Sequence, residues 1–333
     1  MSGVARSGRR PGHPPGYEPI TADELDDLTR PADGLAYAAI AWDYGWIIAA
    51  VCLSELLSGW LYPITVLLIG SRQQGLLVLM HEASHAKLLT DQAQNDRIGE
   101  FVLAWPLLFS MLAYRANHIA HHDHLNSADD PDWRRYRDPR SPEARDWRFP
   151  RPARETWRLL LRDLCGLNVI QQIARMRRLF RPRDHRSASD KLGACERVEL
   201  PQRWRIARAL VYVAILALAV VTGLWKPLIG YWIIPALTSL KALIRLRQLV
   251  GHFAVHGADG LRTTLCGPLE RFLVAPHNIG FHTEHHLYPE VAWHRLPELH
   301  RRMRRRGDYR SGTPFRLCRG HLSSIADWSG TST

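Results

Sequence analysis

The stretch LYPITVLLIGSRQQGLLVLMHEASH, residues 61–85, runs from an apolar segment directly into two histidines. Residues 61–80 are long enough to cross a membrane as one helix, because a span needs about 20 mostly apolar residues. His81 and His85 follow four residues apart, so both imidazoles project from one face of a helix. Imidazole is a neutral nitrogen ligand of iron, zinc and copper. The stretch therefore predicts a membrane helix that ends in metal ligands.

Two further histidine clusters repeat this helical spacing, and they are His118-Ile-Ala-His121-His122 and His282-Thr-Glu-His285-His286. Residues three and four apart on a helix are neighbours, so the imidazoles of each cluster converge. A chain with 17 histidines among 333 residues contains an HxxHH pattern by chance only roughly 0.04 times. Eight imidazoles also exceed the four ligands of one tetrahedral ion. The clusters therefore predict two metal ions at a membrane surface.

The apolar segments come in two pairs, residues 46–60 with 61–80 and residues 209–225 with 228–243. The first segment is short for a full span, and we expect a tight hairpin around Gly59 and Pro63. Residues 98–113 are also apolar, but Glu100 and Pro106 interrupt them, which predicts a re-entrant or interfacial helix. The pattern predicts an all-α integral membrane protein with four transmembrane helices in two hairpins, interfacial helices and a histidine-rich cap.

The net charge of +12 is concentrated in a few basic segments. These are the N-terminal tail, the Arg-rich residues 125–205 and residues 301–306. The positive-inside rule assigns all three to the cytoplasm, and two hairpins then place both termini and every histidine cluster on that side. Apolar spans beside basic segments favour anionic lipid headgroups over nucleic acid as the partner. Residues 157–180 predict an amphipathic helix, which either lies on lipid or packs on the protein's own core.

Composition also predicts how the chain is divided. Residues 1–35 are predicted to form a disordered basic tail, residues 36–310 a membrane domain that includes the Arg-rich segment, and residues 311–333 a C-terminal tail. The five cysteines are scattered and form no CxxC pair, which argues against a disulfide scaffold and against cysteine-ligated zinc.

The first cluster alone permits a different enzyme. His81-Glu82-Ala-Ser-His85 matches HExxH, in which two histidines bind zinc and the glutamate is the general base of a protease. A zinc membrane protease would leave the six histidines of the other two clusters without a role. A further alternative is a membrane protein that binds metal without catalysis.

The three clusters, in the order HxxxH, HxxHH and HxxHH between and after two hydrophobic hairpins, resemble the membrane-bound fatty acid desaturase and hydroxylase superfamily. The resemblance covers about residues 46–301. It is supported by Tyr114-Arg115, by the acidic residues 129–132 and by the motifs Asn278-Ile-Gly-Phe-His282 and Leu287-Tyr-Pro-Glu290. Desaturation and hydroxylation begin with the same hydrogen abstraction, and these motifs do not distinguish them.

The resemblance implies two irons held by the eight clustered histidines. It also implies a ninth ligand at the cytoplasmic end of the last membrane helix, which is His252 here, with His256 as a weaker alternative. Gln248, one turn earlier, is then placed to hold a metal-bound water. Many relatives carry a glutamate before this histidine, whereas this chain has Gly251.

Other polar residues are expected to orient the imidazoles by hydrogen bonds. The candidates are Glu82, Asp129, Asp130, Asp132, Asn278 and Glu284. Asp130 precedes Pro131 and is equally well explained as a turn residue that binds backbone amides. His124 and His277 are expected to support the site or lie at the surface. No function is expected for His13, His185, His294, His300 or His321.

The resemblance also implies the reaction and its partners. O₂ is the expected co-substrate, and the chain has no flavin, haem or iron–sulfur motif, so electrons would come from a ferredoxin or a cytochrome b5-like protein with its reductase. The Arg-rich cytoplasmic surface suits an acidic donor. The expected activity is a double bond introduced into a long-chain fatty acyl substrate. The alternative is hydroxylation or another oxygenation of a lipid, carotenoid or natural-product chain.

Overall fold

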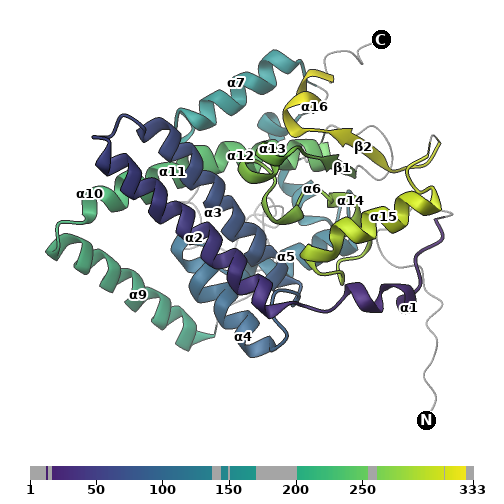
Figure 1. The fold of residues 1–333 in the computed structure, drawn as a ribbon, viewed down its shortest axis with the longest axis horizontal. Helices are drawn as coiled ribbons and strands as arrows, with labels where there is room; N and C mark the ends of the chain where they lie inside the picture. Colours follow the sequence, from purple (N-terminus) through teal and green to yellow (C-terminus); the bar gives the residue numbers. More distant parts are fainter. Residues whose placement is uncertain are drawn as a thin grey trace, which may run out of the picture.

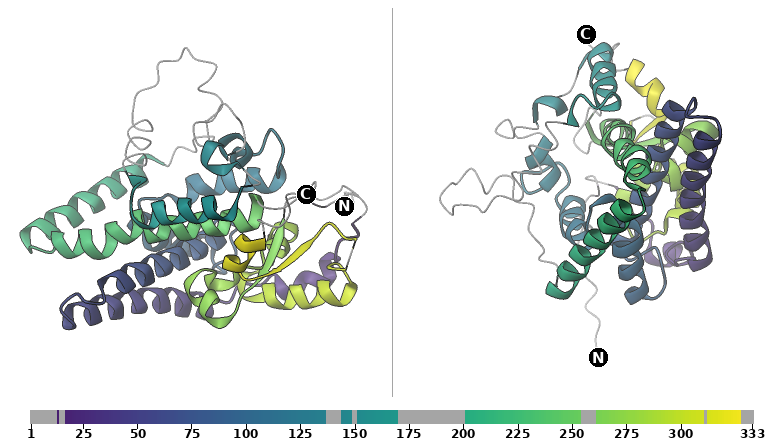
Figure 2. Two further views of the ribbon diagram at one scale, coloured as in Figure 1. Left: turned by 90° about the horizontal axis from the view of Figure 1, so that it is seen from above. Right: turned by 90° about the vertical axis from the view of Figure 1, so that its left-hand side faces the viewer.

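The computed structural model describes residues 13, 17–136, 144–148, 151–169, 201–253, 261–310 and 312–327. The described chain is mostly helical and contains four helices long and apolar enough to cross a membrane. Figures 1 and 2 show the long helices side by side, with shorter elements gathered at one end of them. The predicted all-α membrane architecture is confirmed.

The first hairpin consists of α2 (Asp33–Leu56) and α3 (Tyr62–Ser84). The turn between them contains Ser58 and Gly59, both at positive φ. The helix α2 starts well before the apolar run at residue 46, so the first span is full length although its apolar run is short. The apolar run is short because Asp43 interrupts it, yet this carboxylate is buried against Arg72 of α3 rather than in water or lipid.

The second hairpin consists of α9 (Gln202–Val221) and a broken span over Trp225–His252. The broken span contains α10 (Trp225–Leu228), a π-helical turn, α11 (Ile234–Leu237), α12 (Ser239–Gln248) and a second π-helical turn, Leu249–Phe253. Such π-helical turns occur frequently at functional sites. Here the last one carries His252.

A sharply bent pair of helical segments follows the first hairpin. The α4 helix (Gln92–Arg97) continues through π-helical and 3-10 turns to Leu107, and α5 (Met111–Asp123) leaves at 98°. The buried Glu100 carboxylate holds the bend, because it accepts hydrogen bonds from Trp105 Nε1 at 2.6 Å and from the Leu112 N–H at 2.8 Å. The charge that interrupts the apolar run at residues 98–113 therefore stabilises the bend.

Contacts along the chain place all three histidine clusters at one end of the bundle. The start of α2 lies beside the end of α3, because Asp33 accepts a hydrogen bond from the Thr90 N–H at 2.8 Å. The bent segment leaves α3 next to His85 and returns to it through His118, whose ring centroid is 4.8 Å from that of His85. It therefore leaves and returns to the same end of the bundle. Both hairpins open toward the same side as the clusters.

The cap over this end contains the third cluster and several short elements. They are α13 (Pro268–Leu273), α14 (His282–Leu287), α15 (Leu296–Arg306), α16 (His321–Asp327) and the parallel strands β1 (Arg262–Leu265) and β2 (Arg316–Arg319). Their core also takes in residues from the beginning of the chain. Leu25 and Leu28 are fully buried with Tyr288 and Leu299.

Parts of both predicted tails are folded against this cap. Residues 17–35 contain α1 (Ala22–Leu25), which begins with a Thr21–Glu24 capping box, and the start of α2. Residues 312–327 contain β2 and α16. The predicted boundaries at residues 35 and 311 therefore cut through packed structure. Hydrophobic residues such as Ile20 are too sparse in these segments for composition to indicate burial.

The Arg-rich region is described at residues 125–136, 144–148, 151–169 and 201–205, and it contains α6 (Pro131–Tyr136) and α7 (Ala153–Leu164). One face of α7 packs on α12, where Leu160 meets Leu243 and Asp163 pairs with Arg245. Trp157 and Leu161 are exposed on the same helix. The helix therefore packs on the protein's core and also presents apolar side chains outward. The α7 helix ends at Leu164, and residues 170–180 of the predicted helix lie outside the described residues.

Candidate metal centre

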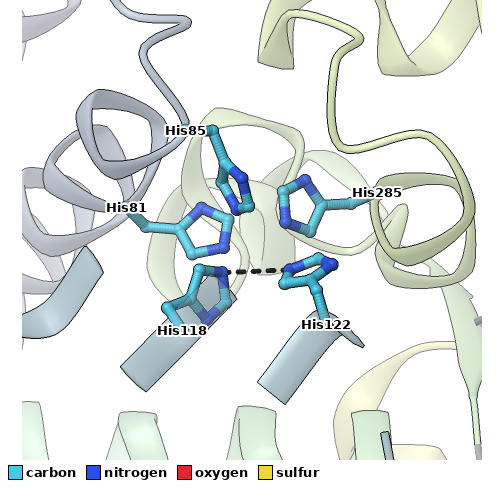
Figure 3. Close-up of side chains that lie close together, drawn as sticks. All are labelled: His81, His85, His118, His122 and His285. Atoms are coloured by element: carbon cyan, nitrogen blue, oxygen red, sulfur yellow. Dashed lines mark hydrogen bonds between the residues drawn. The ribbon is translucent and has the colours of Figure 1, made fainter. Parts of the chain in front are cut away.

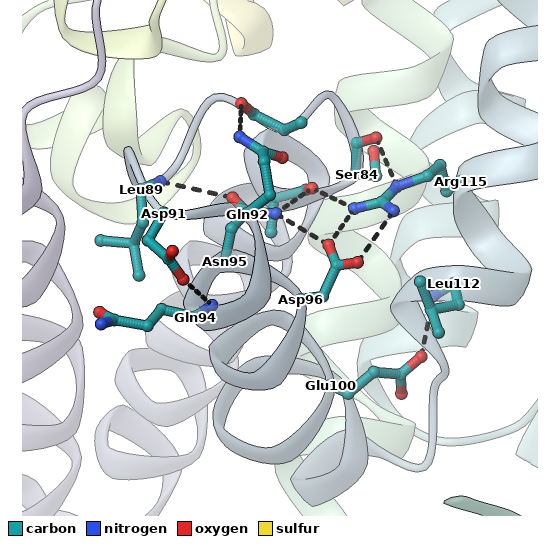
Figure 4. A network of polar contacts seen from close by, with 12 residues as sticks. Ser84, Leu89, Asp91, Gln92, Gln94, Asn95, Asp96, Glu100, Leu112 and Arg115 are labelled. Carbon is teal, nitrogen blue, oxygen red and sulfur yellow. Dashed lines mark hydrogen bonds and ion pairs between the residues drawn. The ribbon is translucent and has the colours of Figure 1, made fainter.

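The first cluster sits on the last turn of α3, whose terminal carbonyls are held by residues from the bent segment and α5 (Figure 4). Arg115 donates to the carbonyls of Ala83 and Ser84, both at 2.9 Å, and pairs with Asp96 at 2.5 Å. Asn95 donates to the same Ala83 carbonyl at 2.9 Å. Orphan carbonyls at a helix C-terminus need such partners. These bonds fix the first cluster to the helix that carries the second.

Five imidazoles from three helices converge on one point (Figure 3). The five are His81 and His85 from α3, His118 and His122 from α5, and His285 from α14; each offers a ring nitrogen within 4.8 Å of the others. Within this group, His118 Nε2 and His122 Nε2 are 3.1 Å apart. We call it the five-histidine group.

A second group lies directly beside the first. His121, His252 and His286 each offer a ring nitrogen within 4.8 Å of the others. His282 joins them, because its Nε2 lies 2.7 Å from His252 Nε2. The two groups are adjacent, since the rings of His122 and His286 stack at 4.2 Å between centroids. We call His121, His252, His282 and His286 the four-histidine group. The nine predicted histidines are thus brought together, and His256 lies outside the described residues.

The ring nitrogens of both groups fit bound metal ions. Among the described residues, several buried ring nitrogens have no hydrogen-bond partner, including His85 Nε2, His121 Nε2 and both nitrogens of His285 and His286. A buried polar atom without a partner costs about 1–3 kcal/mol, which a metal–nitrogen bond would offset. Burial also holds the pKa of His282, His285 and His286 well below the usual histidine range. They are therefore neutral, which is the form that binds a metal.

Two of the predicted carboxylates contact rings of these groups. Asp130 lies 2.9 Å from His121 Nδ1 and also accepts the backbone N–H groups of Asn126 and Asp132, at 2.9 and 2.8 Å. It therefore orients an imidazole and also stabilises a turn, so both interpretations of this residue apply. Glu82 lies 3.1 Å from His81 Nδ1 and accepts the Trp293 N–H. Both contacts leave Nε2 of the ring directed to the centre.

A small cavity opens beside the four-histidine group. His121 and His252 line it together with Asp132 and Gln248, two of the residues expected to support the site. The backbone N–H of Asp129 bonds to Ser127, and its side chain is exposed. Asp129 is therefore more exposed than Asp130, which is buried.

Two other support residues bind elsewhere. Glu284 is buried, but its carboxylate accepts from His300 Nδ1, Thr263 Oγ1 and Tyr309 OH, each at 2.5 Å. Asn278 donates to the Trp293 carbonyl at 3.2 Å. These residues hold the α14 helix and its preceding loop in place rather than a ligand imidazole. Residues two apart on a helix are rotated by about 200°, so Glu284 faces away from His282 and His286.

Two histidines outside the predicted ligand set have clear partners, and sequence reasoning expected only His277 to support the site or lie at the surface. His300, for which no function was expected, is buried and completes the Glu284 network. His277 Nε2 lies 2.7 Å from Asp43 of α2, and the other Asp43 oxygen accepts from Arg72 of α3 at 3.0 Å. This buried network ties the first hairpin to the loop before the third cluster. The available signal was the presence of Asp43 and Arg72, opposite charges inside adjacent apolar segments.

Gly251 is explained by close packing. A Cβ atom at this position would lie 2.9 Å from Cδ2 and 3.2 Å from Nε2 of His282. Any larger side chain therefore requires His282 or the π-helical turn to shift. The small residue lets His252 and His282 approach each other.

Comparison with known proteins identifies the family of this chain. The family model for fatty acid desaturases matches residues 58–317, most of the chain. The chain belongs to the fatty acid desaturase family. It is therefore a multi-pass membrane protein and an oxidoreductase, and its histidine cluster is compatible with iron.

Similar curated proteins carry out different oxidations. A dihydrorhizobitoxine desaturase of Bradyrhizobium elkanii is 27% identical over 277 residues, which cover 81% of this chain and 75% of that protein. A β-carotene ketolase of a Paracoccus species is 24% identical, covering 87% of this chain and 96% of that protein. A sphingolipid delta(4)-desaturase of Drosophila melanogaster is 24% identical, with coverages of 78% and 74%.

Proposed function

We propose that this protein is an O₂-dependent di-iron oxidoreductase that introduces a double bond into a long-chain fatty acyl substrate. The observation that carries the proposal is the convergence of nine imidazoles from four elements at one end of a membrane bundle. Nine imidazoles in two adjacent groups exceed what one ion needs. Membership of the desaturase family supports the class of reaction.

The five-histidine group would hold one iron and the four-histidine group the other. When bound, the iron pair supplies the activation of O₂ and the cleavage of an unactivated C–H bond. The chain's own residues position the reactants. Glu82 and Asp130 fix the orientation of His81 and His121, and Asp132 and Gln248 line the small cavity beside His121 and His252, where their side chains could hold a water. Desaturation also requires the hydrocarbon to be held with two neighbouring C–H bonds in reach.

The proposed orientation places the metal centre and both termini in the cytoplasm. Its support is the excess of arginine on the cluster side, including residues 301–306 on α15. Electrons would come from an external ferredoxin or cytochrome b5-like protein with its reductase. A basic surface favours association with such an acidic donor.

A second candidate is insertion of oxygen into a hydrocarbon chain. The observation that favours it is the similarity to a ketolase along almost that protein's whole length. The two reactions differ in how the substrate lies against the same centre. Product analysis therefore distinguishes them, whereas metal analysis does not.

The test is expression in cells with a compatible reductase system under ¹⁸O₂, followed by mass spectrometry of lipids and metabolites. Desaturation predicts a product that has lost two hydrogens and carries no ¹⁸O, formed only with O₂ and absent from the His121→Ala variant. A product that contains ¹⁸O would replace desaturation with oxygenation.

Iron analysis of the purified protein completes the test. About two irons per chain are expected, because the ligands form two groups. One zinc that depends only on His81 and His85 would overturn the proposal in favour of a protease. Full iron loading with neither product, in reduced protein, would favour a metal-binding protein without catalysis.

A further inference from the structure

A third cluster of metal-ligand types lies in the cap, outside the nine-histidine centre. Cys266 follows β1, Glu270 lies on α13 and His321 is the first residue of α16. The parallel pairing of β1 with β2 brings these parts of the chain together, with Thr264 opposite Cys318. Each of the three side chains offers one donor atom within 4.8 Å of the other two.

The distances match tetrahedral coordination. His321 Nδ1 lies 3.3 Å from Cys266 Sγ and 3.5 Å from Glu270 Oε1. Zinc binds sulfur at about 2.3 Å and nitrogen or oxygen at about 2.0–2.2 Å, so neighbouring ligand atoms in a tetrahedral site are roughly 3.3–3.6 Å apart. The separations of His321 Nδ1 from the other two atoms therefore match those of ligands on one ion, and the third pair lies within 4.8 Å.

Glu270 Oε1 accepts the backbone N–H groups of His321 and Leu322, and the Cys266 thiol lies 3.5 Å from the Thr264 carbonyl, but the contacts of the His321 ring conflict with one another. The single atom His321 Nδ1 faces both a sulfur and a carboxylate oxygen, yet it carries at most one hydrogen. If Nδ1 donates to Glu270, it cannot also accept from the Cys266 thiol; if it accepts from the thiol, its lone pair faces the carboxylate. His321 is only 2% exposed, whereas Cys266 and Glu270 are partly exposed, so solvent reaches the cluster from their side. A cation between them would be attracted to all three.

We propose that Cys266, Glu270 and His321 bind one divalent transition-metal ion of the zinc class, with water as the fourth ligand. Thiolate, imidazole and carboxylate together are the ligand set of such ions. The absence of a CxxC motif argued against cysteine-ligated zinc, but here the ligands come from three separate elements. His321 lies beyond residue 317, where the family match ends. The site is therefore not inferred from the family.

The ion would fasten the C-terminal segment to the structure beside the third histidine cluster. The segment after β2 would be joined to β1, and Thr263 of β1 bonds to Glu284 between the ligands His282 and His285. A metal that closes a long loop stabilises the folded state by restricting the unfolded chain. The proposed role is structural, and it does not depend on which reaction the nine-histidine centre catalyses.

Cobalt(II) titration of the full-length, iron-loaded protein in detergent tests the site. A thiolate ligand gives a sulfur-to-cobalt charge-transfer absorption, which an all-imidazole centre cannot produce. We expect this band to saturate at one equivalent of cobalt and to disappear in Cys266→Ser. The matched control is Cys318→Ser, on the neighbouring strand, which should retain the band. Iron content should stay unchanged in both variants.

Two further outcomes keep the proposal open to refutation. Glu270→Gln retains the shape of the side chain, and it should weaken cobalt binding by at least about tenfold while the thiolate band persists at high cobalt. Absence of the band in the unaltered protein, or its persistence in Cys266→Ser, would overturn the site and leave a hydrogen-bonded cluster only. Loss of the band in Cys318→Ser would overturn the three-residue assignment.

Discussion

Two of the membrane helices have similar hydropathy but very different surroundings. The most apolar window of α3 has a mean hydropathy of 1.3 and is 67% buried within the protein, whereas that of α9 has a mean hydropathy of 1.9 and is only 6% buried. The α3 helix carries the first histidine cluster, and α9 carries no predicted ligand. Hydropathy therefore identifies both spans but does not indicate which one supports the site.

The polar side chains of α3 account for the difference. Gln73 donates to the Trp232 carbonyl at 3.0 Å and Gln74 donates to the Val274 carbonyl. Gly70 allows close contact, because a Cβ there would lie 2.1 Å from Ser239 Oγ. Small and polar residues of this kind hold membrane helices together. The α3 helix thus connects the last span and the third-cluster loop, while α9 presents leucine and valine outward.

Removal of a predicted metal ligand should have the largest effect on iron content and product formation. His285→Ala removes an imidazole of the five-histidine group. We expect the iron content to fall by at least half and product formation to become undetectable, because an iron loses a direct bond. Leu216→Ala on α9 is the control and should retain both. Iron analysis and product assays measure the two effects, and full iron loading in His285→Ala would remove it from the ligand set.

The buried ion pair of α2 and α3 should give the next largest effect. Arg72→Ala leaves the Asp43 carboxylate without its arginine at a site where both side chains are almost fully buried. Loss of one partner of a buried pair costs about 3–5 kcal/mol. The free energy of unfolding in mixed micelles measures this loss. Arg205→Ala on α9, where the arginine is exposed, should change it by less than about 0.5 kcal/mol. Equal effects would mean that the pair does not stabilise the hairpin.

Sequence patterns located the site better than they located its supports. The histidine spacings place each ligand set on one helical face, and the nine histidines indeed meet. Glu284 and His300 show the limit. These residues are 16 positions apart on different helices, and their contact at 2.5 Å depends on how α14 packs on α15. Sequence spacing shows which residues share one face of a helix. Contacts between separate elements depend on tertiary packing, which the spacing does not show.

The same substitution on the two helices tests the contrast directly. Leu79 on α3 is fully buried, whereas Leu216 on α9 is 62% exposed. Leu79→Ala should destabilise the protein by about 2–5 kcal/mol, because it leaves a cavity in packed protein. Leu216→Ala should cost less than about 0.5 kcal/mol, because lipid chains fill the vacated space. Unfolding measurements in one detergent system compare the two. A large loss for Leu216→Ala would show that α9 meets protein, such as a second chain.

The broken span Trp225–His252 lies between these extremes, since 28% of its window is buried and its end reaches the metal centre. Gly251→Ala adds a methyl group at 2.9 Å from the His282 ring, so His252 and His282 must separate. Displacement of a ligand by its surroundings lowers metal affinity by about 10- to 100-fold. We expect iron to be lost more readily to a chelator while the fold stays stable. Gly230→Ala in the same span is the control, because a Cβ there meets only Tyr62 OH at 3.8 Å, an ordinary contact. Equal chelation rates for the two variants would mean that His282 adjusts freely, and that this end of the span is as tolerant as α9.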